Sequence, residues 1–331
     1  MMFTMTLSKK DSPNNSPVST LALTEKTVRI ATRNSPLALW QANFVKDKLL
    51  SEYPEIQVDI IGMSTKGDQI LDRSLSKVGG KGLFLKELEE ALLNDQADIA
   101  VHSMKDVTVD LPEGLQIPCV FAREQPQDAF VSNQFSTLSE LPKGAVVGTS
   151  SLRRRAQLKH HFPHLKVAQL RGNVNTRLSK LDNGEFDAII LAAAGLIRLG
   201  FEDRIASKID VNDSLPAVGQ GIVGIECRED DEFIQQLLKP LNNSRSQTCL
   251  TAERSMNACL EGGCSVPIAG FAELNGEQLQ LKGIVGDIET GRLISASAAG
   301  IADEANDLGV QVANDLIAQG AMAMIEKAKN H

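Results

Sequence analysis

The sequence predicts an α/β fold of two consecutive α/β domains, followed by a small α+β domain at the C-terminus. Two observations lead to this prediction. Short aliphatic segments alternate with amphipathic segments along residues 27–240. After about residue 245 the pattern changes to a helix, a hairpin signal at Asn275-Gly276 and a long final helix. A chain of 331 residues is long enough for two or three domains.

The first α/β domain is expected to cover residues 27–122 and 222–240. It begins with a strand at Val28, and Ser35 then has the position of a helix N-cap, with Pro36 at the first helical position. A strand over 56–60, a helix over 84–92 and a strand over 99–101 follow. The aliphatic segment 222–225 reads as a strand that returns to this sheet, which should be mostly parallel.

The N-terminal extension, residues 1–26, is polar and has no apolar stretch typical of a secretory signal. We expect it to be disordered.

The second α/β domain is expected over residues 123–221, and the third domain over 241–331. The second has strands at 145–147, 166–170 and 188–191, with helices from Leu152 and over 175–181. The third has a helix over 251–260, which stops at Gly262-Gly263. It then has two hairpin turns and a final helix over 304–327. This pattern predicts an antiparallel sheet with helices on one face.

Composition excludes several classes of function. Acidic residues outnumber basic ones by 42 to 34, which argues against bulk affinity for nucleic acid. No apolar stretch is long enough to span a membrane. The cysteine count is five, and no C-x-x-C pair occurs, so neither a disulfide framework nor a metal site is expected. Reduced thiols in a cytoplasmic protein are the plain interpretation.

Basic residues gather just after the predicted strands, where ligands of open α/β sheets bind. Helix N-termini at these positions favour anions, and Arg recognises carboxylates with two hydrogen bonds. We infer a cleft between the two α/β domains that holds a polyanion, although solvated surface charges would give a similar pattern. GGKG at 79–82 is not a phosphate-binding Walker A loop, so carboxylates fit at least as well as phosphates. The basic residues are Arg33, Lys77, Lys81, Lys105, Arg153, Arg154, Arg155, Arg171 and Arg177.

Three further residues each have two interpretations. Asp106, beside Lys105, is either half of a structural ion pair or a carboxylate that stabilises a cation formed during a reaction. His102 is most simply a buried histidine with a hydrogen-bond partner. Cys264 follows Gly262-Gly263 and is either a small buried thiol or an accessible attachment point.

Seven sequence runs resemble the porphobilinogen deaminase family, and they occur in the family's order from about Val28 onward. The runs are RIATRNSPLALW at 29–40, VGGKGLF at 78–84, AVHSMKDV at 100–107, GTSSLRR at 148–154, LRGNV at 170–174, LPAVGQG at 215–221 and LEGGCSVP at 260–267. The resemblance implies two domains like those of periplasmic binding proteins. It also implies a small three-layer C-terminal domain, with helices on one face of an antiparallel sheet, that carries the cofactor cysteine.

The resemblance also implies an activity. Such a transferase (hydroxymethylbilane synthase) condenses four porphobilinogen molecules head to tail, with loss of ammonia, and releases the linear tetrapyrrole by hydrolysis. The chain grows on a dipyrromethane cofactor bound through a thioether, here to Cys264. Asp106 matches the catalytic aspartate. Cofactor-binding residues would also include Lys105, Ser151, Arg153, Arg154, Arg171 and Gly172. Substrate carboxylates would be bound by Arg33, Ser35, Arg177, Lys77, Lys81 and Arg198.

Two other expectations come with the resemblance, and a third comes from composition. The protein would be a cytoplasmic monomer that takes part in haem biosynthesis and passes its product to uroporphyrinogen-III synthase. Thr108 stands where many relatives have proline, which loosens the turn after Asp106. A hypothesis made from composition alone is that residues 63–83 form a mobile lid.

Two alternative classes remain to be weighed against this one. A non-catalytic two-lobed anion-binding protein would not need Cys264 or Asp106. A transcription regulator with a two-lobed effector domain would need a helix-turn-helix segment, which the first 30 residues lack.

Overall fold

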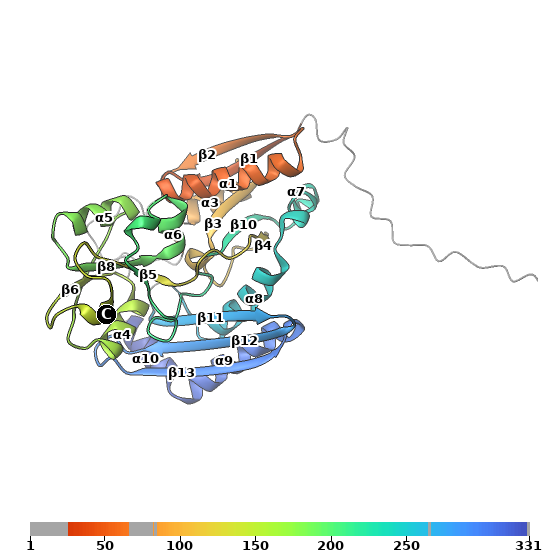
Figure 1. Cartoon of the computed structure of the whole chain (residues 1–331). Coiled ribbons are helices and arrows are strands. Elements are labelled where there is room, and N and C mark those ends of the chain that lie inside the picture. The colour runs from red at the N-terminus through yellow and green to blue at the C-terminus, as the bar shows by residue number, and fades with distance from the viewer. Residues whose placement is uncertain (1–25, 66–81, 83–84, 264–265, 330–331) are drawn as a thin grey trace, which may run out of the picture.

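The chain folds around three β-sheets, which Figure 1 shows as three parts of the molecule. The computed structural model describes residues 26–65, 82, 85–263 and 266–329. Two sheets have α/β architecture, and the third, in the C-terminal part, is antiparallel. The predicted fold class is therefore confirmed. The N-terminal extension and most of the segment proposed as a lid lie outside the described residues.

The first sheet combines the N-terminal strands with the strand that returns from the second part. Its elements are β1 (Thr27–Arg33), α1 (Pro36–Glu52), β2 (Gln57–Met63), α3 (Lys86–Leu93), β3 (Ile99–Ser103), β4 (Leu115–Val120), β10 (Val223–Arg228) and α7 (Glu232–Leu238). The strand order is β2-β1-β3-β10-β4. β10 returns as predicted, but it runs antiparallel to β3 and β4, so the sheet is less parallel than expected. The reason is that the chain builds the whole second sheet between β4 and β10.

The second sheet repeats this plan. Its elements are β5 (Asp128–Val131), β6 (Val146–Gly148), α4 (Leu152–His161), β7 (Lys166–Ala168), α5 (Val174–Asp182), β8 (Ala188–Ala192), α6 (Ala193–Arg198) and β9 (Ser207–Lys208). The order is β7-β6-β8-β5-β9, with β7, β6 and β8 parallel and β5 antiparallel to its neighbours. The carboxyl ends of the parallel strands therefore meet at one edge, where each runs into a loop or a helix.

The third sheet has the order β11-β12-β13 and is antiparallel. Its elements are α8 (Ser244–Cys259), β11 (Ile268–Asn275), β12 (Gln278–Gly286), β13 (Leu293–Ile301), α9 (Ala305–Ala318) and α10 (Ala321–Lys329). One face of the sheet packs on α8, α9 and α10 in a single aliphatic core. The single final helix expected over 304–327 is in fact two helices. Gly320, at φ 97°, turns the chain between them.

α8 begins earlier than predicted because the side chain of Asn243 caps it by accepting a hydrogen bond from the Ser246 amide at 2.9 Å. The other face of the third sheet packs on Leu215. Leu215 lies in the segment 209–222, which leads from β9 of the second α/β part back to β10 of the first and is called the second connector here. The C-terminal end of α4 also contacts this part, where His160 Nδ1 lies 2.9 Å from the carbonyl oxygen of Gly291. The third part is thus fixed against the second.

Candidate active site

Asp106 lies at the end of β3, in a single 3₁₀ turn over Met104–Asp106. Met104 anchors this turn because its side chain is buried and its amide donates to the carbonyl of Ile222 at 3.0 Å. The sulfur of Met104 lies against Gly224 on β10, where there is no room for a Cβ. The position of Asp106 is therefore set by the packing of β3 against β10.

Lys105 and Asp106 face charged residues of the second α/β part. Burial lowers the pKa of Lys105, the charge of Asp106 raises it, and the charges of Arg154 and Arg177 lower it further. Burial and the charge of Arg154 lower the pKa of Arg177 to about 10, against the opposing effect of Asp106 and with a further lowering by Arg171. The structure thus brings five of the predicted residues into one cluster, in which cations surround Asp106.

Arg153 and Arg154 are both buried at the start of α4, whose N-cap is Ser151. The hydroxyl of Ser151 accepts a hydrogen bond from the Arg154 amide at 3.4 Å. The Arg153 guanidinium donates to the carbonyl of Leu215 at 2.5 Å, and that of Arg154 donates to the carbonyl of Ile190 at 3.0 Å. Both arginines are therefore partly committed to holding the fold. Nε of Arg154 is buried and has no hydrogen-bond partner among the described residues.

Asp128, at the start of β5, is the residue that the sequence analysis missed. It is fully buried and accepts from Arg153 at 2.9 Å, from Arg154 at 2.6 Å and from the Ser214 hydroxyl at 2.7 Å. Burial opposes ionisation, but the two guanidinium charges outweigh it and hold the pKa of Asp128 below its ordinary value. A charged residue that opens a buried strand was the only sequence signal for this role.

Arg171, Gly172 and Arg177 form a turn and the first part of α5. Nε of Arg177 donates to the carbonyl of Gly172 at 2.7 Å, which closes the turn over the start of the helix. Gly172 has a φ of 112°, and a Cβ there would lie 2.7 Å from the side chain of Thr176. Only glycine therefore fits this turn. Gly172 was predicted to bind the cofactor. In the structure its backbone conformation allows the turn from which Arg177 comes close to the charges of Arg154 and Asp106.

Arg33 and Ser35 lie where β1 passes into α1. Ser35 caps α1 as predicted, and its hydroxyl accepts from the Ala38 amide at 3.4 Å. Gln41 of the same helix donates to the hydroxyl of Ser103 at 2.7 Å, which ties α1 to the end of β3. Both predicted residues are therefore placed beside the strand that carries Asp106.

Arg198, predicted to bind substrate, has two contacts in the structure. Its guanidinium donates to the carbonyl of Gly221 at 2.7 Å and lies over the ring of Trp40, 5.7 Å from the centroid. Burial lowers the pKa of Arg198, while the charge of Glu124 offsets part of this. In this structure Arg198 connects α6, α1 and the second connector.

Lys77, Lys81 and Cys264 lie outside the described residues. The residues next to Cys264 are placed at the end of α8, where Glu261 has a φ of 50° and the Val266 amide donates to the carbonyl of Gly263 at 3.3 Å. Three other cysteines are buried thiols: Cys119, Cys227 and Cys249. Burial raises the pKa of Cys119 to about 12, so this thiol is inert at neutral pH.

His102 is buried and has a partner, as its simpler interpretation predicted. Its Nε2 lies 2.8 Å from a carboxylate oxygen of Glu226, which is also buried.

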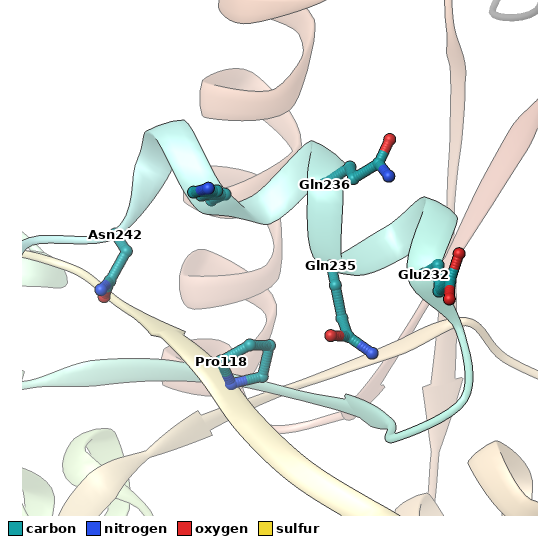
Figure 2. Close-up of a pocket in the computed structure, with 6 residues that line it drawn as sticks. Pro118, Glu232, Gln235, Gln236 and Asn242 are labelled. Atoms are coloured by element: carbon teal, nitrogen blue, oxygen red, sulfur yellow. The ribbon is translucent and has the colours of Figure 1, made fainter. Parts of the chain in front are cut away.

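A separate hollow lies between α7 and β4, and Figure 2 shows its lining. None of the predicted site residues lines it. Its lining residues are Pro118, Glu232, Gln235, Gln236, Lys239 and Asn242.

Two kinds of feature are absent from the described part of the chain. No helix there is long and apolar enough to cross a membrane. No group of three or more His, Cys, Asp or Glu side chains there is arranged to hold a metal ion.

Several solved structures resemble about two thirds of the chain. The periplasmic VFT2 domain of Bordetella pertussis BvgS has 18% identity and a TM-score of 0.41, covering 64% of this chain and 85% of its own. A periplasmic substrate-binding protein of an ABC transporter from Coxiella burnetii has 16% identity and a TM-score of 0.42, covering 65% and 92%.

Two family models match most of the sequence. Residues 28–236 match the porphobilinogen deaminase dipyromethane cofactor binding domain. Residues 247–318 match the porphobilinogen deaminase C-terminal domain. Together these matches span both α/β parts and most of the third part, including the residues on either side of Cys264. The chain belongs to the porphobilinogen deaminase family.

Proposed function

We propose that this member of a transferase family of tetrapyrrole biosynthesis is a hydroxymethylbilane synthase, with Asp106 as its catalytic residue. In each condensation, the aminomethyl carbon of porphobilinogen loses ammonia. A carbon–carbon bond then forms between this carbon and the α-carbon of a second pyrrole, which loses its ring proton. After four condensations, one water molecule releases the linear tetrapyrrole. The observation that carries the proposal is the carboxylate of Asp106 close to the charges of Lys105 and Arg177, beside Arg154, whose own counter-charge is Asp128.

The cations of the cluster suit a ligand with many carboxylates. Porphobilinogen bears an acetate and a propionate, so a growing chain would add two carboxylates with each unit. Lys105 and Arg171 follow the ends of strands and Arg177 lies near the start of α5, where they can bind such groups. Arg154 adds its buried, unpartnered Nε. Because these side chains are already partly desolvated, their attraction for a carboxylate is stronger than it would be in open water.

Asp106 has the opposite charge to its surroundings, and the reaction explains why. Loss of ammonia leaves an electron-deficient carbon conjugated to the pyrrole nitrogen, so positive charge develops on the ring. A carboxylate that accepts a hydrogen bond from the pyrrole N–H stabilises that charge. In its protonated form the same group can give its proton to the departing amine, and the carboxylate so formed can collect the ring proton after the carbon–carbon bond forms.

The residues present fit a dipyrromethane cofactor, for which Arg154, Lys105, Arg171 and Ser151 would hold the carboxylates. Attached to Cys264, the cofactor would supply the nucleophilic pyrrole carbon on which the chain begins. Attachment keeps the growing chain beside Asp106, so each addition avoids the entropy cost of a new encounter.

We also propose the domain boundaries and cellular setting given by the sequence. Domain 1 would cover 27–122 and 222–240, domain 2 would cover 123–221, and domain 3 would cover 241–331. The protein would act as a cytoplasmic monomer and pass its product to uroporphyrinogen-III synthase.

Two measurements test the proposal. The first is the intact mass of the protein and of a Cys264→Ala variant. We expect the mass of two linked pyrrole units on the protein as isolated, or after incubation with porphobilinogen, and no addition on the variant. A folded protein that never gains this mass would refute the cofactor assignment.

The second measurement compares the turnover of porphobilinogen by Asp106→Asn and by Asp47→Asn. Asp47 is an exposed aspartate of α1 and serves as the matched control. Loss of a general acid–base group costs roughly 100-fold or more in kcat, so Asp106→Asn should fall by at least that factor and Asp47→Asn should not. Equal turnover by both variants would remove Asp106 from the catalytic role.

A further inference from the structure

One arginine of α8 reaches from the third part of the molecule to the loop that follows Asp106. The guanidinium of Arg254 donates to the carbonyl of Thr108 at 2.9 Å and to that of Val109 at 3.0 Å. A longer contact of 3.5 Å joins it to the carbonyl of Val107. Three consecutive carbonyls of one loop therefore converge on a single side chain.

This contact gives the catalytic turn a second anchor. Before Asp106, the buried Met104 is held by the carbonyl of Ile222. After Asp106, the backbone leaves the 3₁₀ turn in an extended conformation, and its carbonyls need hydrogen-bond donors. The side chain of Thr108 supplies only a local bond, from its hydroxyl to the carbonyl of Asp110 at 2.7 Å. Arg254 is the partner that connects this loop to another part of the molecule.

The guanidinium is held by its surroundings as well as by the loop. Arg254 is half-buried, and burial lowers its pKa, while the charges of Glu226 and Asp110 favour its charged form. The preceding residue, Glu253, is fully buried and accepts from the amides of Gly219 and Ala272 at 2.7 Å each. α8 is therefore fixed at this point of the chain, and Arg254 extends from a rigid support.

α8 is also the helix that leads to the proposed attachment point. It ends at Cys259, five residues after Arg254 and five before Cys264. At about 1.5 Å of rise per residue, Arg254 lies roughly 7.5 Å from the end of the helix. One helix thus holds the loop after Asp106 and begins the segment that bears Cys264.

We propose that Arg254 is a positioning residue that holds the loop after Asp106, and with it the Asp106 carboxylate, in the position needed for the reaction. The proposal rests on the function proposed above. A displacement of a catalytic group by about 1 Å can cost roughly 100-fold in rate, so the loss of this anchor should appear in the chemical step. Binding of free porphobilinogen depends on the cations of the cluster, which Arg254 does not contact in this structure, so KM should change little.

The test compares Arg254→Gln and Arg254→Lys with Arg245→Gln. Arg245 lies at the exposed start of the same helix and provides a matched loss of charge. For each variant, kcat and KM for porphobilinogen are measured per cofactor-bearing molecule, which is counted from the intact mass. Hydrogen exchange of residues 104–110 is followed in the same samples.

We expect kcat of Arg254→Gln to fall about 10- to 100-fold, with KM within about twofold of the unaltered protein. The kcat of Arg254→Lys should lie between those of Arg254→Gln and the unaltered protein, because one ammonium group cannot reach all three carbonyls in the geometry of a guanidinium. Exchange of residues 104–110 should be faster in both variants, and Arg245→Gln should match the unaltered protein.

Two results would overturn the proposal. If kcat per cofactor-bearing molecule is unchanged while the melting temperature falls, Arg254 contributes only to packing. If KM rises and kcat does not fall, Arg254 acts in binding. Should Arg254→Gln fail to fold, Arg254→Lys decides by the same criteria. Failure of the proposed function itself would be seen separately, as absence of turnover by the unaltered protein.

Discussion

Replacing Asp128 by asparagine would test whether one buried carboxylate holds the two arginines of the proposed cofactor site. One carboxylate oxygen, Oδ1, accepts from Arg153 at 3.0 Å, from Arg154 at 2.6 Å and from Gln220 at 3.0 Å. The other, Oδ2, accepts from Arg153 at 2.9 Å and from the hydroxyl of Ser214 at 2.7 Å. Every partner in this set is a donor, so the site is built for an acceptor with two equivalent oxygens.

Asparagine has only one such oxygen, and its amide group would face donors in either orientation. With the NH₂ group at Oδ2, the Ser214 hydroxyl can turn to accept, but Arg153 loses its partner there. With the NH₂ group at Oδ1, Arg153, Arg154 and Gln220 all face another donor. In both cases two buried guanidinium charges lose their counter-charge. Breaking a buried ion pair on one side costs about 3–5 kcal/mol, a large share of the roughly 5–15 kcal/mol that stabilises a typical domain.

Urea denaturation at pH 7 would measure this cost, with Ser214→Ala as the control. The control removes one neutral donor and should cost only about 1 kcal/mol. The deficit of Asp128→Asn should shrink as the pH falls. The guanidinium charges lower the pKa of Asp128, so its stabilising effect is complete above the unfolded pKa and is lost as pH falls through the folded value. A deficit below about 1 kcal/mol at pH 7, with normal cofactor loading, would refute the reasoning.

Three shorter predictions follow from other positions. Glu89→Gln should raise the free energy of unfolding more at pH 8 than at pH 5, because burial and a neighbouring carboxylate raise the pKa of Glu89 to about 7 and the fold therefore disfavours its ionised form. Urea denaturation would show this, and the exposed Glu90→Gln should change little at either pH. Thr108→Pro should keep kcat within about twofold, since the preceding residue is already extended at φ −79° and ψ 129°. Gly221→Ala should lower stability by about 2 kcal/mol or more in thermal unfolding, because φ is +88° and a Cβ would overlap the carbonyl of Glu124.

Local sequence signals predicted the elements that position the site. Ser35 caps α1, as its type and its place before Pro36 and an apolar segment predicted. The start of α4 at Leu152 was also predicted, although its cap Ser151 was not. The position of the basic residues after strands was predictable because a strand, the loop that follows it and the next helix together cover only about twenty residues. Gly320 was also a local signal, yet an otherwise helical pattern concealed the break that its positive φ produces.

Long-range contacts account for what the sequence could not predict. Asp128 binds Arg153 and Arg154 across 25 and 26 residues and Ser214 across 86, and no local pattern records those separations. The contacts of Arg198 are also long-range. The resemblance implied that Arg198 binds substrate, but no local pattern could show that its guanidinium contacts the Gly221 carbonyl and the ring of Trp40 on α1.

The charges of the cluster stabilise a bound anion more than they stabilise the protein without a ligand. Arg153 and Arg154 share Asp128, so one carboxylate offsets two guanidinium groups. Lys105 is desolvated beside Arg154, which lowers its pKa and shows that its charged form is disfavoured in the free protein. A carboxylate bound there would reverse that effect, because an opposite charge in a desolvated site stabilises the ammonium ion. Binding of each pyrrole unit that brings carboxylates into the cluster would therefore also stabilise the folded protein, as linkage requires.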